Sequence, residues 1–431
     1  MNIPDSKFPR LVIIGGGFGG MNLAQKLKNA PYQVVLVDKR NYHTFQPLLY
    51  QVSTSGLEPD SIAYPLRKII ANQDNMHFRM AEVEHIDTRL QKLRTDIGDL
   101  TYDYLVLATG TKTNFFGNES IEENAVWMKS LPQALNIRSL IFENLEKANR
   151  LEDRQKRKEL LRFVIAGAGP TGVELCGAIA ELRAHVLQRD YPDMDTDDIE
   201  IHLVEGLDRV LPPFSEKSSK QARKFLEKMG VKIHLNTMVA KYENNRVTTT
   251  GDLYFDTATF IWSAGVTGAS ISGIDGAALH EKINRYNVDP YSKVFGFENV
   301  FAIGDIALME TKEYPRGHPQ VAQPAIQQGK HLAKNLKRLA EKKAPEPFKY
   351  FDKGSMATIG RNKAVVDMGK LQFGGFLAWF VWMFIHLWFL VGFRNRLVTI
   401  INWVYSYWNY DKAARLIVRP FKKNRIIAQE D

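Results

Sequence analysis

Short apolar runs alternate along most of the chain with segments whose apolar residues recur at helical spacing. A run over 11–14 enters a glycine-rich turn, a helical pattern follows over 19–28, and a second run covers 34–38. Apolar runs of this length beside glycine turns are typical of buried strands. Strands that alternate with helices favour parallel sheets whose faces are covered by helices. The pattern therefore predicts an α/β fold.

The same order of elements occurs twice in the chain. RLVIIGGGFGG at 10–20 resembles RFVIAGAGPTG at 162–172, and YDYLVLATG at 102–110 resembles FDTATFIWSAG at 255–265. The copies lie about 150 residues apart, a period far too long for stacked repeats. We therefore predict two Rossmann-type domains built on one plan, joined by a charged, leucine-rich helical stretch over 131–160.

The C-terminal part of the chain has a different composition. APEPFKY at 344–350 is typical of a linker, and FLAWFVWMFIHLWFLVG at 376–392 contains only one ionisable side chain, His386. A second apolar stretch over 397–410 follows, and then a cluster of lysine and arginine residues. The net charge of +9 could attract nucleic acid, an anionic membrane or nucleotides. Because the basic end adjoins so many aromatic residues, we expect a membrane rather than a nucleic acid as its partner.

The chain contains a single cysteine, Cys176, which excludes several kinds of redox and metal site. One thiol excludes an intrachain disulfide framework, a four-cysteine metal site and the redox disulfide of many flavin reductases. The histidines show no metal-like spacing, so we expect no metal. The first predicted strand begins near residue 10, which leaves no room for a signal peptide before it. We therefore expect the chain to work in a reducing compartment.

The first glycine-rich turn has the features of a dinucleotide site. Gly15, Gly17 and Gly20 fit the pattern G-x-G-x-x-G, in which the first glycine permits a tight turn, the second lets the backbone approach a pyrophosphate, and the third lets helix and strand pack closely. The following helix offers free N–H groups to the phosphates. Asp38 ends the next predicted strand, where a carboxylate binds ribose hydroxyl groups. The motif does not specify which dinucleotide binds.

The second turn repeats this pattern with Gly167, Gly169 and Gly172. Its predicted acidic partner is Glu205, 38 residues after the first of these glycines, and a polar insert over 188–198 explains the extra length. A carboxylate here would bind the 2′-OH of NADH and repel the 2′-phosphate of NADPH. The alternative is a solvated acid at the end of a strand.

The order of these motifs, together with ATG at 108–110, SAG at 263–265 and GD at 304–305, resembles the two-dinucleotide-binding flavoproteins. Two further segments narrow the resemblance. NYHTFQPLLYQV at 41–52 looks like the segment beside the flavin in type II NADH:quinone oxidoreductases, and AQPAIQ at 322–327 resembles their A-Q-x-A-x-Q quinone-site helix. The resemblance covers nearly the whole chain.

This resemblance implies FAD in the first domain, NADH in the second, and an NADH domain inserted into the FAD domain. The implied boundaries are 1–115 and 270–345 for the FAD-binding domain, 116–269 for the NADH-binding domain and 346–431 for a C-terminal membrane-anchoring region. The implied cofactor-binding residues are Gly15, Gly17, Phe18, Gly19, Gly20, Asp38, Lys39, Pro47, Thr109, Gly110, Gly167, Gly169, Pro170, Thr171, Gly172, Glu205, Gly265, Gly304, Asp305 and Gln323.

The resemblance also implies a function. A membrane-associated flavoenzyme of the respiratory chain would take a hydride from NADH onto FAD and pass two electrons to a quinone, menaquinone or ubiquinone, without pumping protons. It would lie on the cytoplasmic face of the bacterial inner membrane as a peripheral, monotopic protein, and a homodimer is left open. The alternatives are an FAD- and NADH-binding redox sensor and a reductase of a soluble electron carrier; the aromatic tail argues against the second.

Three residues are candidates for the chemistry. Glu174 follows the second glycine motif closely and has two possible roles. It could cap the helix, since acids are favoured in a first helical turn. Alternatively, it could reach the contact of nicotinamide and flavin, where it could orient the nicotinamide ring or transfer protons. The family places an acid there, which favours the second role. Gln323 and Gln327 share a helix face. Their amides are either solvated or contact a quinone carbonyl and the flavin, and the family motif favours the contacts in the site.

The aromatic tail allows three interpretations. It could be a transmembrane anchor, since its length borders on what crosses a bilayer, or a buried hairpin or dimer contact. The third possibility is a pair of helices lying in the membrane interface, where tryptophan is favoured and lysine and arginine meet anionic head groups. We expect the third, because a lipid-soluble quinone must reach the flavin from the bilayer.

Overall fold

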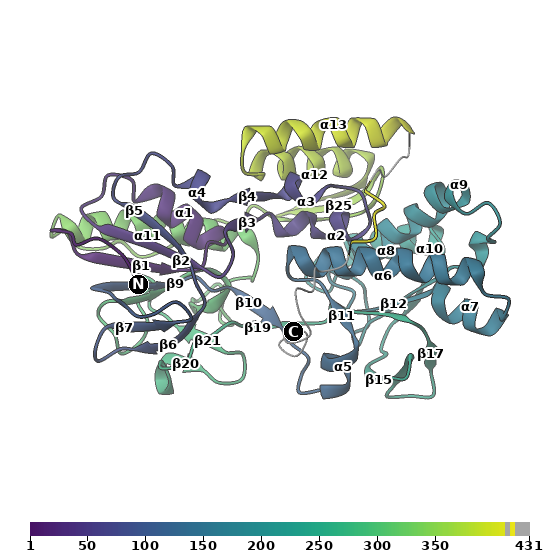
Figure 1. Cartoon of the computed structure of the whole chain (residues 1–431), viewed down its shortest axis with the longest axis horizontal. Coiled ribbons are helices and arrows are strands. Elements are labelled where there is room, and N and C mark those ends of the chain that lie inside the picture. Colours follow the sequence, from purple (N-terminus) through teal and green to yellow (C-terminus); the bar gives the residue numbers. More distant parts are fainter. Residues whose placement is uncertain (410–413, 419–431) are drawn as a thin grey trace. The chain divides into compact units, whose positions relative to one another are not determined.

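The computed structural model describes residues 1–409 and 414–418 (Figure 1). The chain divides into two compact units, and each contains one copy of the duplicated plan. Unit 1 comprises Met1–Thr44, Ala63–Lys112 and Val266–Lys353, and unit 2 comprises Phe45–Ile62, Thr113–Gly265 and Gly354–Asp431. Most of the C-terminal region expected over 346–431, from Gly354 onward, therefore groups with the second copy of the plan.

Unit 1 is built on a five-stranded parallel sheet with the order β22-β9-β1-β2-β5. The strands are β1 (Arg10–Ile14), β2 (Gln33–Asp38), β5 (Met76–Met80), β9 (Tyr104–Leu107) and β22 (Val300–Ala302). Helix α1 (Phe18–Lys26) follows β1 directly and packs against α11 (Ala322–Ala340). The two helices approach closely because Gly329 has no side chain, and a Cβ there would clash with the carbonyl oxygen of Gly19.

Smaller elements complete unit 1 around one apolar core that includes Val12, Leu107 and Tyr286. Three small sheets contribute, with the orders β3-β4, β6-β7-β8 and β20-β21-β23. Their strands are β3 (Tyr42–Thr44), β4 (Ala63–Pro65), β6 (Val83–Asp87), β7 (Lys92–Thr95), β8 (Leu100–Thr101), β20 (Leu279–His280), β21 (Arg285–Asn287) and β23 (Ala307–Leu308). A short helix, α4 (Leu66–Ile69), follows β4.

Unit 2 repeats the plan with a five-stranded parallel sheet of order β11-β18-β12-β13-β14. The strands are β11 (Val126–Trp127), β12 (Arg162–Ala166), β13 (Glu200–Val204), β14 (Val231–His234) and β18 (Thr259–Trp262). The strand before the glycine turn has equivalent neighbours in the two sheets. In unit 1, β1 lies between β2, which ends in the acid, and β9, which leads into ATG. In unit 2, β12 lies between β13, which the acid follows, and β18, which leads into SAG. The predicted α/β fold with two related domains is confirmed at this level.

The helices of unit 2 differ in detail from those predicted. The stretch over 131–160 forms two helices, α6 (Leu131–Arg150) and α7 (Arg154–Leu161), because the Asp153 carboxylate accepts the N–H groups of Gln155 and Lys156 and starts a new helix. The helix after the second glycine turn, α8 (Pro170–Leu182), begins directly after Gly169 and continues as a π-helix over Arg183–Leu187. The other helices and strands are α2 (Leu49–Ser53), α3 (Pro59–Ile62), α5 (Glu119–Asn124), α9 (Gln188–Asp190), α10 (Glu216–Lys228), β15 (Val239–Glu243), β16 (Arg246–Thr249) and β17 (Tyr254–Asp256).

The C-terminal part of unit 2 is an antiparallel sheet followed by two helices (Figure 1). The sheet, which the sequence analysis missed, comprises β24 (Ser355–Gly360), β25 (Lys363–Met368) and β26 (Leu371–Gly375). The apolar stretches form α12 (Phe376–Phe389) and α13 (Phe393–Asn409), and α12 packs on β25 and β26. Among the described helices, none combines the length and the apolar character that crossing a membrane requires.

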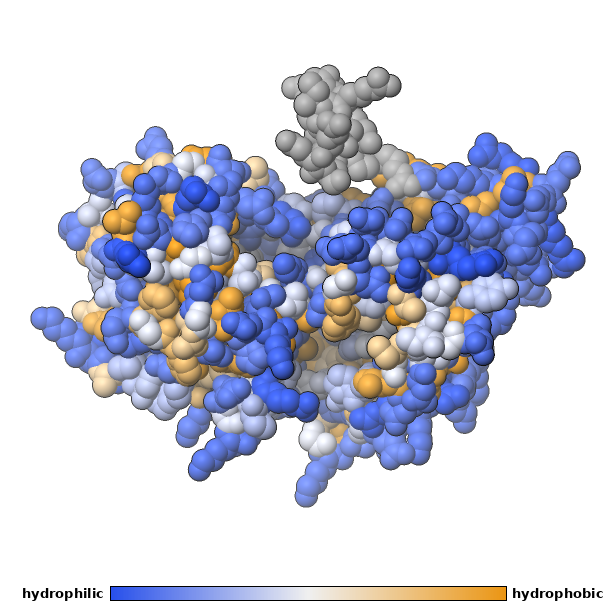
Figure 2. Space-filling model, turned by 90° about the horizontal axis from the view of Figure 1, so that it is seen from below, coloured by the Kyte–Doolittle hydropathy of each residue, from blue (hydrophilic) through white to orange (hydrophobic). Residues whose placement is uncertain are grey.

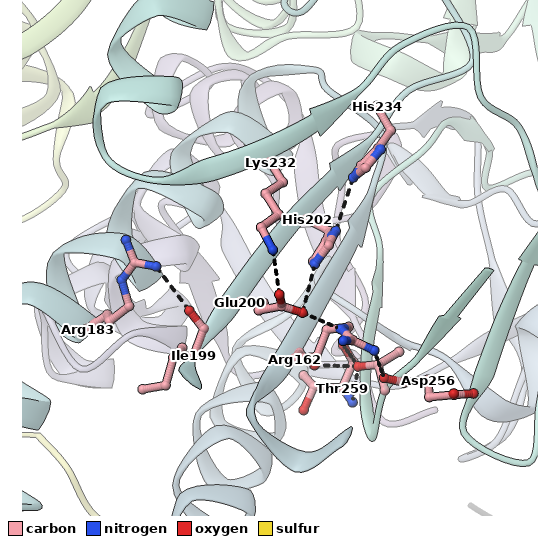
Figure 3. A network of polar contacts seen from close by, with 10 residues as sticks. Arg162, Arg183, Ile199, Glu200, His202, Lys232, His234, Asp256 and Thr259 are labelled. Atoms are coloured by element: carbon pink, nitrogen blue, oxygen red, sulfur yellow. Dashed lines mark hydrogen bonds and ion pairs between the residues drawn. The ribbon is translucent and has the colours of Figure 1, made fainter. Parts of the chain in front are cut away.

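A polar network joins three neighbouring strands in unit 2 (Figure 3). Glu200 at the start of β13 accepts hydrogen bonds from Arg162 of β12 and Lys232 of β14. Burial opposes the ionisation of Glu200, but the bonds from Lys232 and Arg162 outweigh it and lower its pKa to about 2. His202 contacts the same carboxylate, and its ring stacks on that of His234. The charged residues Arg162, Glu200 and Lys232 lie at or next to the first residues of their strands, away from the glycine turn at the carboxyl ends, so we assign them a structural role. The histidines extend the network along the sheet to His234, the last residue of β14.

Replacing Glu200 by Gln should lower the free energy of unfolding by about 1–3 kcal/mol at pH 7, because the partly buried Arg162 and the more exposed Lys232 both lose their charge partner. The pKa of Glu200 is lowered by folding, so its stabilisation is complete above the unfolded-state pKa of about 4.3 and disappears as the pH falls toward about 2. Denaturant unfolding of both proteins from pH 7 to pH 3 measures this.

The matched control is Glu227→Gln, which removes an exposed ion pair with Arg223 on α10. Such pairs contribute little, so the control should lose at most about 0.5 kcal/mol. A Glu200→Gln loss that stayed constant down to pH 3 would contradict the proposed electrostatic origin.

Candidate active site

The first glycine turn is held by the acid that the sequence analysis paired with it. The carboxylate of Asp38 accepts the N–H of Gly16 at 2.6 Å and that of Arg40 at 2.8 Å. Gly15 has a φ of +105°, which L side chains rarely adopt, and a Cβ at Gly20 would clash with the Gly15 carbonyl. A Cβ at Gly17 would meet nothing within 4 Å, so open space lies above the middle glycine of the turn.

The second turn repeats these contacts. The carboxylate of Glu205 accepts the N–H of Ala168 at 2.6 Å and that of Leu207 at 2.9 Å. A Cβ at Gly172 would clash with the carbonyl oxygen of Gly167, whereas a Cβ at Gly169 would meet nothing within 4 Å. The duplication therefore extends to individual hydrogen bonds, and both turns leave open the space in which a dinucleotide turn of this kind holds a pyrophosphate.

Other predicted residues of unit 1 surround the first turn or lie further away. Thr109 follows β9 directly, and its buried hydroxyl has no hydrogen-bond partner in the described part of the chain. An orphaned hydroxyl beside an open turn fits a bound cofactor. Gly304 donates its N–H to Gln328, which fixes the segment that carries Asp305. Lys39, by contrast, forms an exposed ion pair with Glu82.

The remaining predicted cofactor residues are distributed over both units. Phe18 and Gly19 begin α1, and Gly110, with a φ of +69°, follows Thr109. In unit 2, Pro170 and Thr171 begin α8, Gly265 adopts a φ of +90° against Phe116, and Pro47 lies in a short 3-10 helix over Gln46–Leu48. Their contacts with a nucleotide stay predictions.

Glu174 lies in the middle of α8 rather than in its first turn, because the helix already begins at Pro170. The capping interpretation is therefore wrong. The carboxyl group instead faces β24 and accepts the N–H of Thr358. Burial raises the pKa of Glu174 well above its usual range, and the bond from Thr358 offsets this only in part. Burial therefore favours the protonated form of the Glu174 carboxyl group.

A cavity of unit 2 opens beside Glu174. It encloses about 850 Å³ not filled by protein atoms, counting the solvent at its mouth. Its walls come from α2, α8, β24, α12 and α13, and much of the lining is aromatic. Tyr50, Trp382 and Trp403 contribute to it. The lining combines these aromatic rings with polar and charged side chains, among them Gln51, Glu181 and Arg361, and a concave site of this kind can hold a small molecule.

The two predicted quinone-site glutamines begin α11 in unit 1. Gln323 is the second residue of the helix, and Gln327 follows one turn later. The Gln327 amide donates to the carbonyl of Phe351 at 2.9 Å and accepts its N–H at 3.0 Å. Gln327 thus fixes the backbone at residue 351, and a role toward a quinone stays a prediction for both glutamines.

Two open glycine turns in a duplicated α/β plan define an oxidoreductase of the two-dinucleotide class. Consistent with this, a family model described as pyridine nucleotide-disulphide oxidoreductase matches residues 9–329, and one described as the NDH2 C-terminal domain matches residues 353–408. The chain is 38% identical to a type II NADH:quinone oxidoreductase of Mycobacterium tuberculosis over 92% of its own length and 88% of the relative's. The chain belongs to the pyridine nucleotide-disulphide oxidoreductases and, within them, to the type II NADH:quinone oxidoreductases.

More distant proteins share the fold. The chain is 30% identical to an internal alternative NAD(P)H-ubiquinone oxidoreductase of Arabidopsis thaliana over 93% of its length and 84% of the relative's. It matches the structure of Plasmodium falciparum NDH2 in complex with NADH with a TM-score of 0.87 and 20% identity, covering 96% of this chain and all of that one. A sulfide:quinone oxidoreductase of Aquifex aeolicus matches with a TM-score of 0.71 and 18% identity, over 96% of each chain.

The predicted family, fold class and enzyme class are thus confirmed. The disulfide in the family's description has no counterpart here, because the single cysteine, Cys176, is buried without a second thiol. The relatives are redox enzymes by name, which favours the enzyme over the redox sensor.

Sequence reasoning missed several residues that the site uses. Tyr50, Gln51 and Trp403 form a hydrogen-bonded chain beside the cavity. Gln328 positions the Gly304 segment, and His43 holds the Gly16 carbonyl from a buried position. The 41–52 segment was recognised as a family signature, but only Pro47 was taken from it, because nothing local shows which side chains point inward.

Replacing Glu174 by Gln should lower quinone-dependent turnover about 10- to 100-fold, the usual contribution of a positioned acid or base. The fold should survive, since an amide oxygen can still accept the Thr358 N–H. Because folding raises the pKa of Glu174, ionisation favours the unfolded state increasingly as the pH rises above about 4.3. The variant should therefore melt at the wild-type temperature or higher at pH 8.

Steady-state NADH:quinone assays and thermal melts at pH 6 and pH 8 measure both effects. Unchanged turnover would remove Glu174 from the chemistry. A lower melting temperature with loss of bound flavin would make the residue structural.

Proposed function

We propose that the chain binds FAD at the turn of unit 1 and NADH at the turn of unit 2, and reduces a membrane quinone with electrons from NADH without pumping protons. The supporting observation is the pair of matched turns, each fixed by a carboxylate and open above its middle glycine. When bound, FAD takes up the hydride of NADH and passes two electrons to the quinone. The proposed domains are those of the sequence analysis.

FAD would be held by the residues around the first turn. The N–H groups at the start of α1 point toward the pyrophosphate position, where the helix dipole favours negative charge. Asp38 keeps lone pairs for a ribose hydroxyl while it accepts two backbone N–H groups. The Thr109 hydroxyl would gain the hydrogen-bond partner that it lacks among the described residues. The N-terminus of α11, which carries Gln323, would stabilise negative charge on the flavin ring.

NADH would be held in the same manner at the second turn, with Glu205 in the place of Asp38. Its carboxylate would accept a hydrogen bond from the adenosine 2′-OH, whereas a 2′-phosphate would place negative charge beside it. This arrangement favours NADH over NADPH. Glu174 would supply and receive a proton near the reacting groups, and Gln323 and Gln327 would address the quinone.

The C-terminal helices support binding to a membrane surface. Helix α13 buries the polar residues Asn395 and Thr399 and exposes apolar ones, with Phe393 81% and Trp408 77% exposed. This is the reverse of a helix that faces water. The other exposed apolar residues are Phe376, Leu377, Phe380, Phe384, Trp388 and Phe389 of α12 and Leu397, Ile400, Ile401, Val404 and Tyr405 of α13. We call this set the apolar helix face.

The apolar helix face would lie in the membrane interface, with Arg394 and Arg396 near the lipid head groups. The face of the molecule seen in Figure 2 is mostly hydrophilic. We propose the cytoplasmic face of the inner membrane as the location. The basic cluster beyond residue 418 lies outside the described residues, and a homodimer stays a prediction.

The function is tested with purified protein under anaerobic conditions. NADH should bleach the flavin absorbance within the dead time of manual mixing, and a short-chain quinone should restore it with one quinone reduced per NADH. NADPH should act at least tenfold more slowly. Bleaching without reoxidation by quinone would instead support a redox sensor or a reductase of another carrier.

Two matched variants test the cofactor assignment in the same assay. Gly17→Ala and Gly169→Ala each place a methyl group into open space above one turn, so both should fold. Gly17→Ala should purify with less flavin, judged by the ratio of absorbance at 450 and 280 nm. Gly169→Ala should keep its flavin and raise the KM for NADH about tenfold or more. The opposite pattern would mean that the two sites are exchanged.

Replacing Phe393 and Trp408 together by Glu should weaken binding to vesicles containing anionic lipid at least 100-fold, because each aromatic side chain contributes roughly 2 kcal/mol when it leaves water. Co-sedimentation with vesicles measures the partition coefficient. The control is Leu90→Glu, which changes an equally exposed leucine (69%) of unit 1 and should bind as the wild type. Equal binding of all three proteins would remove the membrane role of this face.

A further inference from the structure

A chain of hydrogen bonds crosses unit 2 from the membrane-facing helix α13 to the cavity. The indole N–H of Trp403 donates to Oε1 of Gln51 at 2.8 Å, and Nε2 of Gln51 donates to the hydroxyl oxygen of Tyr50 at 2.8 Å. Tyr50 and Gln51 are neighbours on α2, whereas Trp403 comes from α13. All three residues line the cavity.

The direction of this chain is fixed by its first member. An indole N–H can only donate, so the Gln51 atom that faces Trp403 must be the amide oxygen. The amide nitrogen must then face Tyr50, which removes the usual ambiguity of an amide side chain. Because the Tyr50 oxygen accepts this N–H, its own hydrogen is turned away from Gln51. Tyr50 is therefore a donor to something other than its neighbour.

The surroundings of Tyr50 show where that hydrogen can go. The side chain is 6% exposed and lines the same cavity as the buried acid Glu174. Burial first, and then the charge of Glu174, raise the pKa of Tyr50 well above 10, so the phenol keeps its proton. Trp382, 2% exposed, lines the cavity as well, and its indole N–H has no partner among the described residues. The cavity thus combines flat aromatic walls with unused donors.

Those features suit a planar ring that carries carbonyl oxygens. We propose that Tyr50 donates a hydrogen bond to a carbonyl oxygen of the quinone, that Trp403 and Gln51 position its hydroxyl for this, and that Glu174 is the acid that protonates the same oxygen. The proposal rests on the quinone reductase function proposed above. It adds a substrate-contacting residue and two positioning residues to that site.

The step balances with the reactants already named. NADH, one proton and the quinone give NAD⁺ and hydroquinone, so NADH supplies both electrons and one of the two hydrogens. At the quinone oxygen that faces Tyr50, the O–H bond of the Glu174 carboxyl breaks as the new O–H bond of the hydroquinone forms, and solvent then reprotonates the carboxylate. Tyr50 keeps its proton throughout this step. Its hydrogen bond stabilises the negative charge that develops on the quinone oxygen.

The test is Tyr50→Phe, which keeps the ring and removes the donor. The kcat/KM for a short-chain quinone should fall about 10- to 100-fold, and the solvent deuterium isotope effect on quinone reduction should rise. The anaerobic bleaching of flavin by NADH and the reduction of ferricyanide, which takes up electrons without protons, should keep wild-type rates. The control Tyr254→Phe, at an exposed position on β17, should match the wild type in every assay.

A second variant addresses the positioning. Trp403→Phe frees the Gln51 amide to turn, so that Tyr50 can donate to Gln51 rather than to the cavity. Its kcat/KM for quinone should fall about 3- to 10-fold, again with ferricyanide reduction intact. This variant also tests the proposal if Tyr50→Phe fails to fold.

The outcomes are distinguishable. Wild-type kcat/KM for quinone in both variants would overturn the proposal, and so would an equal loss with quinone and ferricyanide, which indicates a structural role. If the wild-type protein bleaches with NADH but no quinone reoxidises it, the function proposed above fails, and this proposal fails with it.

Discussion

Helix α8 and strand β24 lie so close together that residue 177 must be glycine, because a Cβ there would strike the carbonyl group of Ile359. Glu174 and Glu181 lie on the same helix face and accept the N–H groups of Thr358 and Arg361. Because β24 is an edge strand, these backbone N–H groups have no neighbouring strand to accept them, and the two carboxylates accept them instead. The C-terminal sheet is thereby joined to the nucleotide fold of unit 2, and the cavity and the buried acid depend on this contact.

The parts of the fold that follow local rules could be predicted from the sequence. Each glycine turn, its helix and its acid lie within about 40 residues, and their spacing alone sets the contacts. Asp38 and Glu205 therefore bind the same position of their respective turns, as the duplication predicts. The central strands were found to within one or two residues for the same reason, since apolar runs between glycine turns have few alternatives.

The parts that depend on distant contacts could not be predicted. Trp403 and Gln51 are 352 residues apart and meet only because α13 and α2 belong to one unit. The strands β24 to β26 are short, and β26 is rich in glycine. Their sequence pattern is therefore hard to distinguish from that of a linker. The spacing shows that Glu174 follows the second glycine motif closely but does not fix the first residue of α8, and a start at Pro170 puts Glu174 beyond the first turn. Gln327 shows a further limit, because a family motif does not reveal that an amide is already bonded to Phe351.

The inverted polarity of α13 has a consequence for how the enzyme meets its substrate. A quinone with a long isoprenoid tail is essentially absent from water, so an enzyme that takes it up at the apolar helix face, as proposed above, would draw on a two-dimensional reservoir. The quantity that governs the rate is then the mole fraction of quinone in the lipid rather than its concentration in the sample volume. Adding more lipid at a constant amount of quinone would lower the turnover rate of such an enzyme. Diluting enzyme and membrane together with buffer would leave the turnover rate unchanged. In the proposed arrangement the membrane would set the enzyme's substrate concentration as well as its location.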